Sequence, residues 1–379
     1  MKQRATAYNI PVLELTRRCL KYGKISATGL FILIAYYIKL LIGMVLGFCQ
    51  NLFYSRRISA TKILKPPIFI LGHYRSGTTY LHTLLSKDKR FGYLTNYDMV
   101  CANSSLLFGS WLKKTLQFII KLFNMKTSFF NNKRPDLDEP AEEDRFLINK
   151  GLPYTDYWGF VFPLSKGALT ECSKQLKKEN YFPGWKKAYL HTLKLITYKN
   201  SGKQLVLKNP PNTERIKYLL KLFPDAKFVY IHRNPYHVFY SMRNLWIRAI
   251  KKYCLQKITD DQVEEIVFDL FEHMIDQYET DKFLIPAKNL FEVKYEQLEA
   301  DPLLTMKEMY AALNLPAFDE ISSDLKTHLT KDRNYKKFHY SFSEETFRHI
   351  EIRWSKYIKA SAGSKSNSSN ILLSNVLNP

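Results

Sequence analysis

A glycine-bracketed loop within the stretch ILGHYRSGTTYLH (residues 70–82) contains residue types that bind a phosphate group. Gly72 and Gly77 lie between an apolar run and a helical pattern. Backbone N–H groups at such a strand-to-helix turn, with the helix dipole behind them, form a binding site for an anion. Arg75 adds a permanent positive charge and a planar fork of donors that matches phosphate oxygens. We therefore expect this loop to bind a phosphate-bearing ligand.

Three hydroxyl side chains in the same loop, Ser76, Thr78 and Thr79, add further hydrogen-bond donors for that phosphate. A nucleoside triphosphatase has a lysine directly after the second glycine of its phosphate-binding loop, whereas this chain has Thr78 there. In addition, no acid that could bind Mg²⁺ clearly ends a predicted strand. The pattern therefore disfavours a P-loop kinase or nucleoside triphosphatase, which stays an alternative.

A second candidate phosphate site follows the run KFVYIHR at residues 227–233. Arg233 ends this predicted strand, and Ser241 lies early in the predicted helix that begins at Pro235. The carboxyl ends of parallel strands meet at one edge of a sheet, so Arg233 can reach the same ligand as Arg75. The sequence therefore predicts that Arg233 and Ser241 bind a second, separate phosphate. A helix-capping arginine beside a surface serine would give the same pattern.

The elements that must position these residues alternate between strand and helix patterns. Apolar runs predict strands, and apolar residues at helical spacing predict helices between them. This alternation is typical of an α/β fold with a parallel sheet covered on both faces. The predicted strands are 67–72, 204–209, 227–233 and 290–298, and the predicted helices are 78–86, 212–223, 235–246, 260–283 and 302–314.

Residues 66–360 resemble the sulfotransferase superfamily, and in particular its bacterial family related to tyrosylprotein and Golgi carbohydrate sulfotransferases. YRSGTT resembles the loop that binds the 5′-phosphosulfate of 3′-phosphoadenosine 5′-phosphosulfate (PAPS), and HRNPYHVFYS resembles the motif that binds its 3′-phosphate. LVLKNPPNTERIKYLLKLFPDAKFVYIHRNP follows the family pattern around them. The resemblance implies sulfuryl transfer from PAPS to a hydroxyl group, without a metal, on a P-loop-like three-layer fold with a central parallel sheet flanked by helices.

Sulfuryl transfer places negative charge on the departing phosphate, so a cation is needed at the bridging oxygen. Arg75 is one candidate for that cation. Lys208 is the other, because it ends the apolar run LVLK and resembles the lysine with this role in tyrosylprotein sulfotransferases. We expect both side chains to stabilise the leaving group.

The general base is left open between two acids. Related enzymes place a glutamate in the region that reads LTNYDMV here, where Asp98 is the acid. The bacterial family also has an acidic motif similar to DEPAEEDRF, in which Glu143 and Asp144 lie at matching positions. Asp98 and Glu143 are therefore both candidates for the base. We interpret His73 and His82 as packing or loop residues.

From Gly29 to Phe48 the chain is almost wholly apolar, interrupted by Lys39. This length is close to the roughly 20 residues that span a bilayer. Basic residues flank both ends, so the positive-inside rule selects no orientation. We expect a hydrophobic helix in or at the interface of an anionic membrane, with a buried core helix as the alternative. The predicted organisation is a membrane-associating segment at 1–60, a sulfotransferase domain at 61–360 and a disordered tail at 361–379.

The net charge of +22 favours an anionic partner, and no helix-turn-helix, zinc-finger or RNA-platform pattern indicates nucleic acid. Five widely spaced cysteines without a CxxC pair indicate neither a disulfide framework nor a metal site, which favours a cytoplasmic location, at the cytoplasmic face of the membrane. A non-enzymatic, basic, membrane-binding protein is the second alternative. The hydroxyl acceptor is unidentified, although aromatic residues in the segments 101–135 and 150–190 favour a lipid or a carbohydrate.

Overall fold

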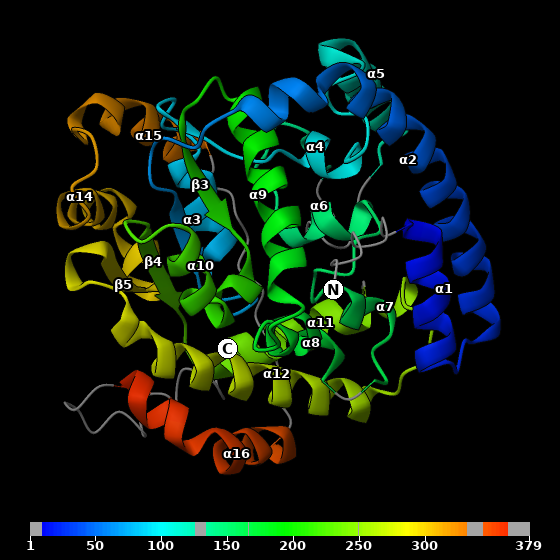
Figure 1. Ribbon diagram of the computed structural model, residues 1–379. Helices are drawn as coiled ribbons and strands as arrows, with labels where there is room; N and C mark the ends of the chain where they lie inside the picture. The colour runs from blue at the N-terminus through cyan, green and yellow to red at the C-terminus, as the bar shows by residue number, and fades with distance from the viewer. Residues whose placement is uncertain (1–9, 126–133, 166, 249, 332–343, 363–379) are drawn as a thin grey trace.

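The computed structural model, which describes residues 10–125, 134–165, 167–248, 250–331 and 344–362, contains a central parallel sheet with helices on both faces (Figure 1). The five strands lie in the order β2-β3-β1-β4-β5, and every neighbouring pair is parallel. The expected α/β class is therefore confirmed. The strands are β1 (Ile68–Leu71), β2 (Phe91–Gly92), β3 (Gln204–Lys208), β4 (Lys227–His232) and β5 (Leu290–Lys294).

Alternate residues of the central strands enter two different cores, which explains why these strands read as continuous apolar runs. Phe69 and Phe228 belong to a core that includes residues of α9 (Phe182–Lys199) and α10 (Ile216–Leu222). Ile68 and Val229 belong to a core on the opposite face. It includes residues of α3 (Thr78–Leu85), α14 (Pro302–Ala312) and α15 (Asp319–Lys331).

A third core, rich in aromatic side chains, lies beside the sheet. It joins α11 (Pro235–Arg248), α12 (Asp260–Asp281) and α16 (Glu344–Ala362) around the buried rings of Trp246 and Trp354. The shorter helices are α4 (Asn96–Val100), α5 (Gly109–Leu122), α6 (Glu143–Asn149), α7 (Trp158–Val161), α8 (Glu171–Gln175) and α13 (Tyr295–Ala300). The 3₁₀ turns are η2 (Ala168–Thr170), η3 (Pro210–Glu214), η4 (Ile250–Lys252), η5 (Lys282–Leu284) and η6 (Ala287–Asn289).

Two helices precede the sheet, α1 (Pro11–Tyr22) and α2 (Ala27–Ala60), and α2 curves around the outside of the molecule (Figure 1). By length and composition, α2 could cross a membrane, and 17% of its most apolar window is buried. A helix of the protein core would be mostly buried, so the alternative of a buried core helix for Gly29–Phe48 does not describe this structure. The disordered tail expected at 361–379 lies outside the described residues, except for the last two residues of α16.

Candidate active site

The glycine-bracketed loop joins β1 to α3, as the sequence predicts. Gly72 and Gly77 adopt φ angles of 141° and 101°, in the region that favours glycine. A Cβ atom at Gly77 would lie 2.3 Å from Cδ2 of Tyr295, so no larger residue fits there without rearrangement. Within the loop, the Ser76 hydroxyl donates a hydrogen bond of 2.7 Å to the carbonyl oxygen of His73. Thr78 is buried, whereas Thr79 is exposed at the first turn of α3.

The two predicted phosphate motifs meet in the folded chain. Nε of Arg75 donates to the Ser241 hydroxyl over 2.7 Å, and Nη1 of Arg233 donates to the carbonyl oxygen of Arg75 over 3.3 Å. The Arg233 guanidinium lies 4.3 Å from the centre of the Tyr295 ring. Its Nε is buried and has no hydrogen-bond partner among the described residues. A buried donor without an acceptor destabilises the folded protein unless a ligand accepts its hydrogen bond. The oxygens of a phosphate group could accept it.

Lys208 reaches the same loop from the neighbouring strand. The parallel register of β1 and β3 pairs Ile70 with Lys208, which places the lysine at the edge where the loop begins. Its Nζ lies 3.3 Å from the Thr79 hydroxyl and forms an ion pair with Glu142. The Lys208 side chain is 3% exposed, so its charge acts at short range in a largely water-free setting.

Glu142, which the sequence analysis did not single out, is the acid in contact with Lys208. It directly precedes α6, and its carboxylate also accepts a hydrogen bond from the Tyr157 hydroxyl. Burial alone would raise the pKa of Glu142, but the neighbouring Lys208 and Arg145 outweigh it and hold the pKa below its usual range. Glu142 is therefore ionised at neutral pH. The sequence shows Glu142 within the acidic run DEPAEEDRF, but it gives no reason to select Glu142 over the other acids of that run.

The two acids predicted as alternative bases have other surroundings. Asp98 completes the capping box of α4 with Thr95 and forms an ion pair with Lys199. Glu143 is fully buried, and neither carboxylate oxygen has a hydrogen-bond partner among the described residues. Burial raises the pKa of Glu143 to about 8. Among the described residues, neither acid forms a hydrogen bond or an ion pair with Lys208, and their predicted role stays a prediction.

Asp144, next in the acidic run, belongs to a buried ionic network. Its two carboxylate oxygens each accept a hydrogen bond of 2.8 Å from Arg215, which also donates to Asp156 over 2.7 Å. All three side chains are fully buried. This network joins the acidic run to η3 and α10 and fixes the backbone on which Glu142 and Glu143 lie.

His73 and His82 are buried, in agreement with their interpretation as packing residues. Burial lowers the pKa of His73 to about 4 and that of His82 to about 3, so both rings are neutral at pH 7. The His73 ring packs edge-on against Phe271 of α12, and the His82 ring packs in the same way against Tyr93. Both rings therefore contribute to the buried packing that holds the loop and α3.

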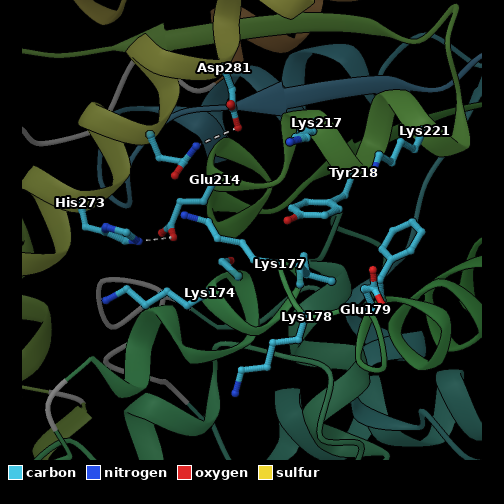
Figure 2. Close-up of a pocket in the computed structure, with 14 residues that line it drawn as sticks. Lys174, Lys177, Lys178, Glu179, Glu214, Lys217, Tyr218, Lys221, His273 and Asp281 are labelled. Carbon is cyan, nitrogen blue, oxygen red and sulfur yellow. Dashed lines mark hydrogen bonds and ion pairs between the residues drawn. The ribbon is translucent and has the colours of Figure 1, made fainter.

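A cavity of about 620 Å³ lies elsewhere, between α8, α10 and α12 (Figure 2). Its lining mixes lysines such as Lys177 and Lys217 with the acids Glu214 and Asp281, and His273 lies 3.2 Å from a Glu214 oxygen. None of the predicted site residues lines this cavity. Its size therefore does not identify it as the active site.

Comparisons with known proteins match this chain to sulfotransferases. The model of a family described as "Sulfotransferase family" matches residues 66–320. Omega-hydroxy-beta-dihydromenaquinone-9 sulfotransferase Stf3 of Mycobacterium bovis is 29% identical over 317 residues, which cover 83% of this chain and 79% of that protein. The protein of the same name from Mycobacterium tuberculosis has the same identity and coverage.

Two solved structures share the fold. Sulfotransferase STF9 from Mycobacterium avium superposes with a TM-score of 0.73 at 15% identity, over 96% of this chain and 93% of that chain. Sulfotransferase STF1 from Mycobacterium tuberculosis superposes with a TM-score of 0.67 at 19% identity, over 91% of each chain. At these identities the likeness concerns the fold, including the parallel sheet whose edge carries the loop.

Proposed function

Because this chain belongs to the sulfotransferase family, it is a sulfuryl-transferring enzyme, and we propose that its donor is PAPS. The observation that carries this proposal is the meeting of two motifs far apart in the sequence. Arg75 of the first motif donates to Ser241 of the second, and Arg233 donates to the backbone of Arg75. A ligand with two separate phosphate groups explains why two basic motifs converge in this way.

Each motif would bind one end of the donor. The loop from Arg75 to Thr79 would hold the 5′-phosphosulfate through backbone N–H groups, the hydroxyls and the Arg75 guanidinium. Arg233 and Ser241 would hold the 3′-phosphate, whose oxygens can complete the buried Nε of Arg233. Tyr295 beneath the Arg233 guanidinium would keep its planar fork in place.

In the transfer step, the acceptor oxygen forms a bond to sulfur while the bond between sulfur and the bridging phosphate oxygen breaks. The electron pair of that bond leaves with 3′-phosphoadenosine 5′-phosphate. Lys208, near the Thr79 hydroxyl at the start of α3, would neutralise the charge that develops on the departing phosphate, together with Arg75. The enzyme's contribution is then mainly positioning and charge stabilisation.

We propose that Glu142 takes the proton of the acceptor hydroxyl. It is ionised, it lies against Lys208, and its second carboxylate oxygen is oriented by Tyr157. Glu143, with its pKa raised to about 8, would be largely protonated at neutral pH and is less suited to accept a proton. Asp98 is held in a helix cap. Asp98 and Glu143 stay alternative bases, and their amide variants provide the comparison with Glu142→Gln.

We further propose that the acceptor is a hydroxyl on a lipid and that the enzyme works at a membrane surface. Two curated relatives are sulfotransferases whose names specify a menaquinone derivative. In this chain, Tyr157 comes from the aromatic segment expected to contact the acceptor, and its ring packs against Tyr74 and Phe160 beside Glu142. An apolar acceptor could lie against these rings while its hydroxyl faces Glu142.

Donor binding tests the proposal directly. Titration calorimetry with 3′-phosphoadenosine 5′-phosphate should show binding to the wild-type protein, and Arg233→Ala should weaken it by a few kcal/mol, as for loss of a charge-assisted contact. The matched control is Arg243→Ala, which removes an arginine of the same helix region that pairs with Glu264 instead. If ATP binds more tightly than this nucleotide, or if Arg233→Ala binds it normally, the proposed donor site is wrong.

Turnover tests the catalytic lysine separately. With radiolabelled PAPS and a nitrophenol as acceptor, Lys208→Ala should lower kcat by roughly 10²-fold while the affinity for 3′-phosphoadenosine 5′-phosphate changes by less than about tenfold. The isotope should appear in the phenol and not be released as free sulfate. Normal turnover of Lys208→Ala would remove this lysine from the mechanism.

A further inference from the structure

The outer face of α2 is a continuous apolar stripe. Ile34, Ile38, Val45 and Leu52 are each at least half exposed, and they recur at the spacing of one helix face. Between Leu30 and Phe53 the one charged residue is Lys39. Its side chain points away from the stripe and donates a hydrogen bond of 2.6 Å to Asn149. An apolar strip of this length on a water-facing helix indicates a surface that meets another apolar medium.

The opposite face of α2 is bound to the rest of the protein along its whole length. Near its start, a Cβ atom at Gly29 would lie 2.0 Å from the Leu255 carbonyl oxygen, so the two backbones touch. About two thirds of the way along, Gln50 accepts a hydrogen bond of 3.0 Å from the Leu106 N–H. Near its end, Lys194 donates to the Ser59 carbonyl oxygen over 2.8 Å.

These contacts decide the orientation that α2 can adopt in a membrane. A spanning helix needs apolar surroundings, from lipid or from other apolar helices, over roughly 20 residues. The helix of 34 residues is about 51 Å long, and the folded domain lies against one side of it from end to end. If it crossed the bilayer, it would carry that side of the domain with it. The outer stripe can enter lipid only when the helix lies parallel to the membrane.

A second helix adds to the same surface. α5 follows the segment in which Asn103 lies against Gly43 and Leu106 bonds to Gln50, and it lies next to α2 at the top of the molecule (Figure 1). It has no buried residue. Its exposed Trp111, Phe118 and Leu122 lie on one helical face.

Basic side chains border these apolar faces. Arg56 and Arg57 are exposed in the last turns of α2, and Lys114 and Lys121 are exposed on α5. Lysine and arginine beside an apolar helix face are suited to anionic lipid headgroups. The charge therefore selects an anionic bilayer, in preference to a second protein, as the occupant of this surface.

We propose that the outer stripe of α2 and the exposed face of α5 form one surface that inserts into a single leaflet of an anionic bilayer, with α2 lying in the plane of the membrane. This proposal rests on the proposed function, because it would bring the catalytic domain to a lipid acceptor without requiring the acceptor to leave its membrane. The N-terminal helix is then an interfacial anchor and does not span the bilayer.

Binding to vesicles tests the surface. The full chain should co-sediment with vesicles of phosphatidylcholine and phosphatidylglycerol, and should do so far less with phosphatidylcholine alone. The double variant Ile38→Glu/Val45→Glu should lower the partition coefficient at least tenfold, and Phe118→Glu should lower it at least threefold. The matched control is Phe283→Glu, since Phe283 is 82% exposed and lies away from both helices, in η5. Wild-type binding by the double variant would overturn the proposal.

A depth measurement separates an in-plane helix from a spanning one. An environment-sensitive fluorescent amino acid is placed at Ile34, Val45 or Leu52 of the full chain, and its quenching by lipids brominated at different acyl positions is compared. An in-plane helix predicts shallow positions near the headgroups at all three sites, with differences that come only from the curvature of α2 (Figure 1). In a spanning helix, Ile34 and Leu52 would be separated by about 27 Å along the membrane normal. A depth that changes steadily from Ile34 through Val45 to Leu52 by about this amount would therefore overturn the proposal.

The affinity for 3′-phosphoadenosine 5′-phosphate is measured in every variant, so that failure of this inference differs from failure of the proposed donor. Loss of vesicle binding with unchanged nucleotide affinity supports the surface. Vesicle binding by all variants, with nucleotide binding intact, overturns the surface and leaves the sulfotransferase proposal standing. Vesicle binding that depends on α2 without any nucleotide binding supports the surface and removes the proposed donor.

Discussion

Glu142 and Glu143 are adjacent in the chain but have opposite electrostatic surroundings. Glu142 lies against Lys208 and Tyr157, which favour its ionised form. Glu143 points into a buried setting that offers its carboxylate no hydrogen bond among the described residues, which favours its neutral form. Two neighbouring carboxyls with pKa values shifted in opposite directions are a feature of sites that need one charged acid.

Glu142→Gln should lower kcat on an unactivated alcohol by roughly 10²–10⁴-fold, the usual contribution of a general base. Amide and acid have the same shape, so the nucleotide affinity should change little. The effect should be partly reversed with a nitrophenol acceptor, whose hydroxyl needs little help in losing its proton. Turnover is measured in parallel for Glu143→Gln and Asp98→Asn. Should one of these collapse while Glu142→Gln turns over normally, the base is that acid and not Glu142.

Glu143 should make the protein less stable as pH rises. Its raised pKa means that the folded state binds this proton more tightly than the unfolded state does. The free energy of unfolding should therefore fall between about pH 4.5 and about pH 8, by up to about 1.4 kcal/mol per pH unit. Glu143→Gln removes this dependence and should raise the stability at pH 8.

Denaturant unfolding of wild type and Glu143→Gln at pH 5 and pH 8 measures that difference. Glu308→Gln, an exposed acid in α14, is the control and should follow the wild-type curve. If the free energy of unfolding changes between pH 5 and pH 8 by the same amount in wild type and Glu143→Gln, then Glu143 ionises in the folded state much as it does in the unfolded chain.

At the scale of elements, the site depends on the parallel register of the sheet. The β1–β4 register pairs Leu71 with Tyr230, and the β1–β3 register pairs Ile70 with Lys208. The loop, Lys208 and Arg233 therefore leave the sheet at one edge. The acidic run comes to this edge from outside the sheet, held by the ionic network of Arg215, Asp144 and Asp156.

Arg215→Met should destabilise the fold by about 3–5 kcal/mol, because it leaves two carboxylates buried without their cation. The same substitution at Lys217, an exposed residue two positions further along at the edge of the cavity in Figure 2, should change the stability by less than about 0.5 kcal/mol. Denaturant midpoints of both variants provide the measurement. If Arg215→Met unfolds at the wild-type midpoint, the network does not hold the acidic run in place.

At the scale of the whole molecule, α1 and α2 are packed on the catalytic domain. Leu15 and Leu40 belong to one buried cluster with Phe162 and Leu255. The boundary expected near residue 60 coincides with the end of α2 at Ala60, but these contacts cross it. The expected division into segment and domain stays a prediction, and these contacts show which side chains a truncation would expose.

Removal of residues 1–60 should lower the melting temperature of the remaining chain by more than about 5 °C, since each large apolar side chain re-exposed costs about 1.5–3 kcal/mol. Calorimetry in detergent-free buffer measures this, and the double variant Ile38→Glu/Val45→Glu serves as the control with an intact inner face. If the truncated chain has the same melting temperature as the full-length protein, residues 1–60 are a separable unit.

The sequence alone predicted the parallel sheet, the glycine-bracketed loop between β1 and α3, and the resemblance to the sulfotransferases. Each of these is encoded locally, because apolar runs, two glycines and a basic residue at fixed spacing fold in the same way wherever they occur. It also placed Arg75, Arg233 and Ser241 at one sheet edge, since parallel strands leave little choice of where their ends meet. The sequence pattern does not predict the short strand β2 at Phe91–Gly92, because two residues are too few to show a periodicity.

The glutamate that lies against Lys208, and the way the N-terminal helix is held, depend on contacts between distant parts of the folded chain. The spacing of DEPAEEDRF does not distinguish Glu142 from Glu143, because their surroundings come from β3 and Tyr157, which lie elsewhere in the chain. The composition of Gly29–Phe48 suits a helix that crosses a membrane or lies on one. Only the contacts of its inner face with Leu255, Leu106 and Lys194 settle how it sits on the domain, since they depend on segments that folding brings together.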